Sequence, residues 1–191
     1  DYNGSDDVTV TVTDGALSAE TVFTLTINPV NDAPTLDDLS DASVDEDNIY
    51  TLELSGADVD GDALTFLASV DANGSASIDG TTLSVIPNQD YNGDLIVNVI
   101  ASDGQASGSG SFTLQVLPIN DAPVVSVIDA QTIDEDTSLT LELSASDVDG
   151  DALSFSSSSG LVDGTTLTIT PPEDYNGSDD VTVTVTDGAL S

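Results

Sequence analysis

The sequence predicts an all-β chain built from tandem β-sandwiches of about seven strands each, and three features lead to this fold class. Apolar and polar residues alternate with a period of two, as in the Val-Thr run of residues 8–13. Gly, Asn, Asp and Pro interrupt such runs every ~8–12 residues, which is the turn spacing of a sandwich. No window of helical length has the 3.6-residue period of an amphipathic helix.

Internal repeats predict the domain boundaries. Residues 1–18 recur without change as residues 174–191. The second copy begins 173 positions later, a step that combines two unequal repeats of 89 and 84 residues. We therefore expect residues 1–30 to be the last two strands of a preceding repeat, 31–119 a complete repeat, and 120–191 a repeat that lacks its final strand.

The two repeats are expected to share one strand plan. In the complete repeat, strands are predicted near residues 35–39, 50–55, 64–69, 76–78, 82–86, 95–102 and 109–117. Their counterparts in the second repeat are predicted near residues 124–128, 138–144, 153–157, 165–170 and 180–186. The core of each domain is modest, and domains of this size are often helped by metals.

Charge is the most unusual feature of the composition. The chain has 191 residues with 36 acids and no Lys, Arg or His, so its formal net charge is −36. Because self-repulsion on this scale opposes a compact state, we expect bound divalent cations to complete the fold. A merely solvated acidic surface is the alternative. Disorder is not predicted, because 38% of the residues are apolar.

The same composition excludes several functions. Nothing in the chain could neutralise phosphates, so neither nucleic acid nor an anionic membrane surface is an expected partner. Without His, Cys or Lys, the usual general bases, thiol nucleophiles and soft-metal ligands are missing. Carboxylate pairs could hydrolyse glycosides, but each acidic cluster repeats at a domain pole, where metal binding accounts for it. We therefore expect no enzyme, and oxygen ligands for a hard cation.

An Asp-Val-Asp-Gly-Asp segment occurs once in each repeat, at residues 58–62 and 147–151. Alternating aspartates in a turn resemble the start of an EF-hand calcium loop, although no bidentate Glu follows and no helix flanks them. A solvated Asp-rich turn is the alternative. The candidate ligands are Asp58, Asp60, Asp62, Asp147, Asp149 and Asp151.

Further acidic motifs recur at the ends of the expected strands. Asp-Glu-Asp at residues 45–47 is either a ligand set or a set of charges that blunts a sheet edge. In Asp-Tyr-Asn-Gly at 90–93, the Tyr resembles the tyrosine corner of immunoglobulin-like sandwiches and is expected to be structural, whereas the Asp is a candidate ligand. Asp-Gly at 103–104 is either a hairpin turn or part of a metal site. Each domain thus has acids at both poles.

A connector with proline at each end precedes each Asp-Val-Asp-Gly-Asp segment, at residues 29–34 and 118–123. With the acidic motifs, its Asn-Asp-Ala-Pro sequence resembles bacterial cadherin-like tandem repeats of large secreted, RTX-type surface adhesins. The resemblance covers essentially the whole chain. It implies immunoglobulin/cadherin-like Greek-key β-sandwiches with calcium (Ca²⁺) between successive domains. The connector is shorter than the cadherin Asp-x-Asn-Asp-Asn pattern, and Asp-Tyr-Asn replaces Asp-Arg-Glu, so the number of ions per joint stays open.

Carried over by position, the resemblance implies ligands for two joints. For the complete joint these are Asp45, Glu46 or Asp47, Asp90, Asn120, Asp121, Asp147, Asp149 and Asp187. For the first joint they are Asp1, Asn31, Asp32, Asp58, Asp60 and Asp103, while Asp62 and Asp151 would belong to a further site.

The leading hypothesis is a calcium-rigidified structural spacer of an extracellular bacterial adhesin or surface protein, whose partners are neighbouring repeats bound through calcium. Calcium sites of moderate affinity are typical of extracellular modules, and a signal peptide could lie upstream in a longer parent. One alternative is a filament subunit assembled by strand donation, with residues 19–27 as the donated strand. A second is a carbohydrate- or receptor-binding module, which the four Tyr and four Phe do not favour.

Overall fold

The computed structural model describes residues 2–191, which form eighteen strands and no helix. The all-β class predicted from the period-two pattern is therefore confirmed. The chain divides into two compact units, one ending at Pro118 and the other beginning at Ile119. No helix in the described residues is long and apolar enough to cross a membrane.

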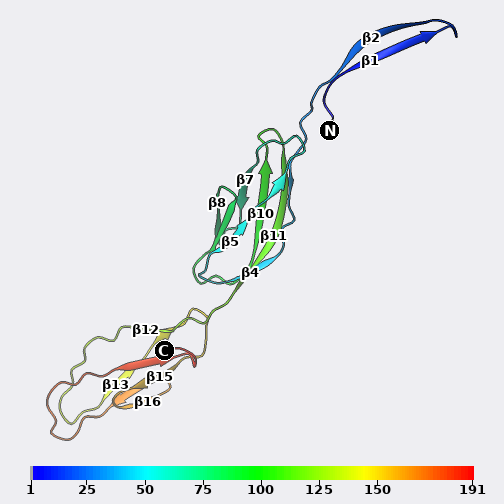
Figure 1. The fold of residues 1–191 in the computed structure, drawn as a ribbon. Helices are drawn as coiled ribbons and strands as arrows, with labels where there is room; N and C mark the ends of the chain where they lie inside the picture. The colour runs from blue at the N-terminus through cyan, green and yellow to red at the C-terminus, as the bar shows by residue number, and fades with distance from the viewer. Residues whose placement is uncertain (1) are drawn as a thin grey trace. The chain divides into compact units, whose positions relative to one another are not determined.

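The chain begins with a two-stranded antiparallel hairpin (Figure 1). Strand β1 (Gly4–Thr13) pairs with β2 (Ser18–Ile27) in a register that runs from Gly4 opposite Ile27 to Thr13 opposite Ser18. Almost every residue of both strands is exposed, including Phe23 at 52% and Leu25 at 48%. A hairpin with no buried face is only marginally stable in water.

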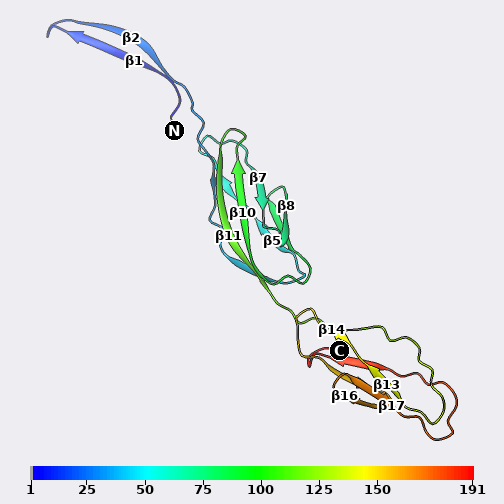
Figure 2. The same ribbon diagram turned by 180° about the vertical axis from the view of Figure 1, so that it is seen from behind.

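The complete repeat holds the next nine strands, arranged in three sheets. A four-stranded sheet has the order β4-β11-β10-β7, a three-stranded sheet the order β5-β9-β8, and β3 pairs with β6. Strands β10 and β11 run side by side along the sandwich in both views (Figures 1 and 2). The bounds are β3 (Thr35–Leu36), β4 (Ala42–Asp45), β5 (Tyr50–Glu53), β6 (Gly56–Ala57), β7 (Thr65–Ser69), β8 (Gly74–Asp79), β9 (Thr82–Pro87), β10 (Gly93–Ser102) and β11 (Ser107–Leu117).

The core of this repeat follows from the alternation in the sequence. Every second residue of β10, from Leu95 to Ala101, has no exposed surface, while the residues between them are exposed. Strand β11 contributes Phe112, Leu114 and Val116. Since successive side chains of a strand point to opposite faces, the period-two pattern places one apolar face of each strand against the other sheet. The rings of Tyr50 and Phe112 meet across the core with centroids 5.9 Å apart.

The second repeat has the same plan but smaller sheets. One sheet has the order β13-β17-β16, β15 pairs with β18, and β12 pairs with β14. The segment between β12 and β13 runs as a coil apart from the strands (Figures 1 and 2). The bounds are β12 (Val124–Val125), β13 (Leu139–Glu142), β14 (Ala145–Ser146), β15 (Ser154–Ser157), β16 (Leu161–Asp163), β17 (Thr166–Ile169) and β18 (Val183–Thr186).

The predicted strands differ from the observed ones mainly in length and in four additions. Strands β4, β6, β14 and β16 lie where no strand was predicted, because two to four residues are too few for an alternation to be recognised. The strand predicted at 35–39 is limited to β3, and that at 180–186 is limited to β18. Strand length depends on a paired neighbour, which periodicity alone does not show.

Candidate metal centre

Each repeat brings its connector, its Asp-Val-Asp-Gly-Asp loop and its Asp-Gly turn together at one end, which we call the head cluster. In the first repeat, Asn31 Nδ2 donates to Asp103 Oδ2 at 2.9 Å. The backbone N–H of Asp32 donates to Asp60 Oδ2 at 2.8 Å. The connector thus bonds both to the loop and to the turn. The members of this cluster are Asn31, Asp32, Asp58, Asp60, Asp62 and Asp103.

The second repeat repeats this geometry on its own connector. Asn120 Nδ2 donates to Asp187 Oδ2 at 2.8 Å, and the N–H of Asp121 donates to Asp149 Oδ2 at 2.8 Å. The members of this cluster are Asn120, Asp121, Asp147, Asp149, Asp151 and Asp187. The structure therefore brings together the connector, loop and turn residues that the sequence singles out, although they lie up to 72 positions apart in the first repeat and 67 in the second.

The first aspartate of each loop leaves one oxygen without a hydrogen-bond partner. Asp58 Oδ1 accepts the N–H groups of Asp60 at 2.9 Å and Asp62 at 3.3 Å, which closes the loop. Asp147 Oδ1 accepts the N–H of Asp151 at 3.2 Å in the same way. The Oδ2 atoms of Asp58 and Asp147 are buried and have no hydrogen-bond partner. Because buried acceptors are nearly always satisfied, these two atoms call for a ligand.

The loop of the second repeat also gathers three carboxylates. Oxygens of Asp147, Asp149 and Asp151 lie within 4.8 Å of one another. Three like charges at this separation repel one another. A divalent cation bound between them would attract all three and outweigh that repulsion. Calcium accepts six to eight oxygen ligands in flexible geometry, and carboxylate, amide and backbone oxygens are the donors present here. The residues of the head cluster therefore fit a hard cation and offer nothing to a soft one.

The turn aspartates of the head clusters are held in the ionised form. The N–H of Ala106, followed by the Asn31 amide and the N–H of Gln105, holds the pKa of Asp103 below its ordinary value. The Asn120 amide, followed by the N–H groups of Leu190 and Ala189, lowers the pKa of Asp187. Hydrogen bonds to the charged form stabilise it. Both carboxylates are thus ionised throughout the neutral range.

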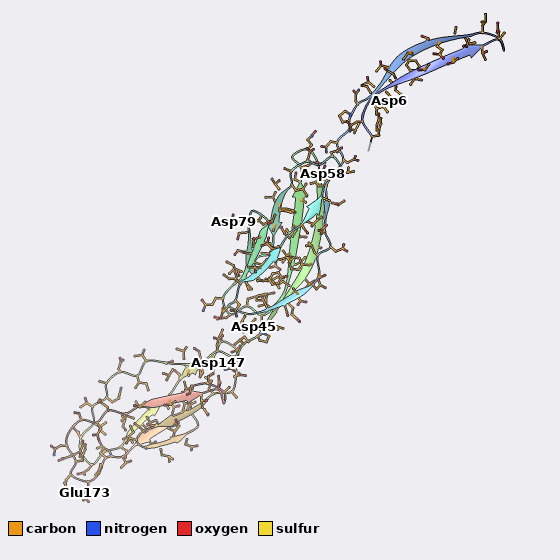
Figure 3. The ribbon with its side chains drawn as sticks, in the orientation of Figure 1. Asp6, Asp45, Asp58, Asp79, Asp147 and Glu173 are labelled. Carbon is orange, nitrogen blue, oxygen red and sulfur yellow. The ribbon has the colours of Figure 1, made fainter. Side chains whose placement is uncertain are left out.

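The opposite end of the first repeat carries a second set of acids, Asp45, Glu46, Asp47 and Asp90, which we call the tail cluster. Figure 3 shows Asp45 and Asp58 at opposite ends of this sandwich. The N–H of Asp90 donates to Asp47 Oδ1 at 3.1 Å, so the Asp-Glu-Asp and Asp-Tyr-Asn-Gly motifs meet as expected. Both residues have left-handed backbone, with φ of 54° and 60°, a conformation that Asp tolerates better than most residues.

Glu46 is the buried member of the tail cluster, with 3% of its surface exposed. Its N–H donates to Leu117 O at 2.8 Å, which ties the cluster to the end of β11. Burying a carboxylate is costly unless it is paired or coordinated. The chain contains no Lys, Arg or His to supply the pairing charge.

The second repeat has a tail of the same kind. The N–H of Asp174 donates to Asp136 Oδ1 at 3.0 Å, and both residues have positive φ. Figure 3 shows Asp147 and Glu173 at opposite ends of this unit. Each repeat therefore presents acids at both ends, as the order of the motifs in the sequence predicts.

Three further residues complete the comparison between prediction and structure. Tyr91 donates its hydroxyl to Asp94 O at 3.1 Å, which agrees with the structural role expected for it. Asp1 lies outside the described residues. Gln105 was not expected at the head cluster, yet its Nε2 donates to Asn31 Oδ1 at 3.0 Å. The second repeat has Ala189 at this position, so no repeated motif could indicate it.

The comparison with protein families decides the classification. A family model described as the bacterial Ig domain matches residues 31–116 and again residues 120–191. The chain belongs to this family. The two matches coincide with the two repeats, so each repeat is a bacterial Ig domain, and the sandwich expected from strand periodicity is an immunoglobulin-like one.

The chain is similar to the three proteins described next. Chitinase A of Pseudoalteromonas piscicida is 32% identical over 134 residues, a match that covers 66% of this chain and 16% of the chitinase. The chain thus spans about a sixth of that relative. Among solved structures, Drosophila N-cadherin EC1-4 is 15% identical with a TM-score of 0.49, covering 87% of this chain and 48% of the cadherin. Domains 4–9 of the surface layer protein SbsC are 16% identical with a TM-score of 0.38, covering 98% of this chain and 34% of that chain.

Proposed function

We propose that these bacterial Ig domains are calcium-stabilised structural spacers of an extracellular bacterial protein. The observation that supports this most strongly is the repeated head cluster, in which one oxygen of Asp58 and of Asp147 is buried without a hydrogen-bond partner. Both lie in a chain with 36 acids and no basic side chain. A cation would therefore come from solution, and calcium suits these oxygen ligands at the affinities typical of extracellular modules.

In this proposal calcium is bound by carboxylate oxygens that the backbone has already positioned. In the second repeat the ligands are Asp147, Asp149 and Asp151, with Asn120 and Asp187 beside them through their own hydrogen bond. The N–H of Asp151 satisfies one oxygen of Asp147 and leaves the other for the ion. Binding neutralises local repulsion and fixes the connector.

The spacer role rests on the short connector between the repeats. Leu117, whose carbonyl accepts the N–H of Glu46, is followed at once by the connector residues 118–123. The tail cluster of one repeat thus continues along the chain into the head cluster of the next. We propose that calcium takes ligands from both, with Glu46, Asp47 and Asp90 from the tail, so that successive domains become a stiff array.

Calcium titration tests the proposal, with Asp147→Asn as the informative variant. Calorimetry should show calcium binding with Kd of roughly 0.1–1 mM, the range of extracellular modules. Asp147→Asn should weaken binding at the head of the second repeat at least ~10-fold, since it removes the negative charge of the first loop aspartate, whose Oδ2 is buried without a hydrogen-bond partner. Asp163→Asn removes one charge from an exposed position on β16 and is the matched control. Equal binding by both variants would exclude the assigned site.

Stiffening is measured separately from binding. Small-angle scattering should show a longer, narrower distribution of distances with calcium than with EDTA, and Asp147→Asn should shift it toward the EDTA profile. Circular dichroism and melting curves that do not change on adding EDTA would contradict the calcium role altogether.

Two classes of parent protein are candidates. A surface adhesin was the expectation from the sequence motifs, whereas the 32% identity with part of a chitinase favours a chitinase as the second candidate. In both, the Ig domains act as spacers. Retention of the chain on chitin beads would instead favour a carbohydrate-binding role, and we expect none above a bovine albumin control.

A further inference from the structure

The carbonyl oxygen of the connector asparagine has different surroundings in the two head clusters. In the first repeat, Asn31 Oδ1 accepts a hydrogen bond from Gln105 Nε2 at 3.0 Å. In the second repeat, the same position after the turn aspartate holds Ala189, which has no side-chain donor. Asn120 Oδ1 therefore receives no bond of this kind.

The nitrogen of the connector asparagine is used in the same way in both head clusters. In each, Nδ2 donates to the turn aspartate and to the backbone carbonyl of the residue after the asparagine. The two distances are 2.9 and 2.8 Å for Asn31, and 2.8 and 3.1 Å for Asn120. Because an amide nitrogen has two hydrogens, both are engaged, and the oxygen is the atom of each amide that can still bind a cation.

The side chain of Gln105 is not needed to form its turn. Its turn aspartate accepts the N–H groups two and three positions ahead, both at 2.6 Å. The Asp-Gly-Ala sequences at residues 14–16 and 187–189 form the same pair of bonds, at 2.6–2.9 Å, without a glutamine. The side-chain amide of Gln105 thus acts on Asn31 rather than on the turn.

The hydrogen bond from Gln105 changes what the head cluster offers to calcium. Calcium takes uncharged carbonyl oxygens as ligands in addition to carboxylates. An oxygen that already accepts an N–H must lose or share that bond to bind an ion. The hydrogens of the Gln105 amide also carry partial positive charge, which repels a cation near the same oxygen. The head cluster of the first repeat therefore has one open oxygen fewer than that of the second.

We propose that Gln105 lowers the calcium affinity of its head cluster by occupying the carbonyl oxygen of Asn31, and that alanine at this position leaves the oxygen open and the affinity higher. The inference rests on the proposed calcium role of the head clusters and adds a residue that sets their affinity. In an array with both kinds of repeat, the heads would fill in two steps as the calcium concentration rises, those with alanine first.

Calcium titration of Gln105→Ala, followed by NMR, tests the proposal. The backbone amide signals of Gly61 and Gly150 lie in the two Asp-Val-Asp-Gly-Asp loops and report each head separately. At Gly61 the variant should bind calcium roughly 3- to 10-fold more tightly than the wild-type chain, since one hydrogen bond no longer competes. The Gly150 titration should not change. An equal or weaker midpoint at Gly61 in the variant would overturn the proposal.

Two further variants separate the hydrogen bond from other effects of the side chain. Ala189→Gln is the reciprocal change and should weaken binding at Gly150 by a similar factor, because the new amide can donate to Asn120. Gln105→Met keeps the length of the side chain but removes the donor, so it should behave like Gln105→Ala. If it bound calcium like the wild-type chain, the bulk of the side chain would be responsible and the proposal would be wrong.

Gln115→Ala is the matched control, since it removes an exposed glutamine of β11 that belongs to neither head cluster. It should leave the Gly61 titration unchanged. Each head is compared with the same head in the wild-type chain, so the residues around it are identical in both measurements.

Failure of this inference can be told apart from failure of the calcium role. If neither Gly61 nor Gly150 responded to calcium well above the range of extracellular modules, both proposals would be wrong. If both loops responded with the same midpoints in the wild-type and Gln105→Ala chains, calcium binding would stand and the role of Gln105 would be excluded. A purely structural role predicts the opposite sign, with Gln105→Ala melting at a lower temperature in EDTA and binding calcium less tightly.

Discussion

At the scale of single residues, backbone N–H groups hold particular carboxylates in place by donating hydrogen bonds to them. The turn carboxylates Asp14, Asp103 and Asp187 each accept N–H groups from residues two and three positions ahead. In the two complete heads, an Asn from the connector adds a further bond. These short-range hydrogen bonds can be predicted from the sequence Asp-Gly, because an Asp side chain accepts hydrogen bonds from the backbone of its own turn.

Asp14 gives a pH prediction that is independent of any proposed ligand. The N–H of Ala16, followed by that of Leu17, lowers the pKa of Asp14 in the folded hairpin. A lowered folded pKa means that the stabilisation is present above the unfolded pKa and is lost as pH falls through the folded value. Carboxylate NMR should therefore show Asp14 titrating below the ordinary value of an aspartate. An ordinary midpoint would mean that the β1–β2 turn is not formed in solution.

Tyr91→Phe tests the structural role of the corner tyrosine. The change removes the hydrogen bond to Asp94 O and should destabilise the first repeat by about 0.5–1.5 kcal/mol in urea unfolding. Tyr2→Phe removes the comparable bond to Asp6 in the exposed hairpin, so it should leave that transition unchanged. If the two variants behaved alike, the corner would have no role in the sandwich.

At the scale of elements, the same strand has different consequences in different surroundings. Strands β2 and β11 share their apolar pattern, yet the face of β11 is buried between two neighbours and that of β2 is exposed. Hydrophobic burial therefore depends on the sheet that receives a strand, whereas its tendency to be a strand depends on its own residues.

Leu114→Ala and Leu25→Ala make this comparison quantitative. Leu114 has no exposed surface, so truncation should destabilise the first repeat by about 2–5 kcal/mol. Leu25 occupies the same place in β2 but is 48% exposed, and its truncation should not move the unfolding transition of that repeat. Denaturant unfolding at low chain concentration measures both. Equal effects would show that the hairpin packs as part of the first repeat.

At the scale of the whole molecule, uniform charge sets the conditions for folding. Net charge of −36 without an internal cation gives self-repulsion that no ion pair offsets. Monovalent salt screens this repulsion without regard to position, while a divalent ion bound at the head clusters acts where carboxylates converge.

Melting temperatures separate the two effects. Calcium at about 1 mM should raise the melting temperature more than sodium chloride at the same ionic strength, because specific binding to the folded state adds to screening. Magnesium is the control, since it holds its water and prefers strict octahedral geometry. Equal effects of calcium and sodium would indicate screening alone.

The sequence by itself determined the class of fold and the motifs of the heads, because period-two alternation and turn chemistry are local properties. It also places aspartates at the strand ends, so the acids of both poles can be recognised without their geometry. Tertiary structure alone decided that Asn31 meets Asp103, that Gln105 joins them, and that one oxygen of Asp58 and Asp147 lacks a partner. Those facts depend on contacts between distant segments.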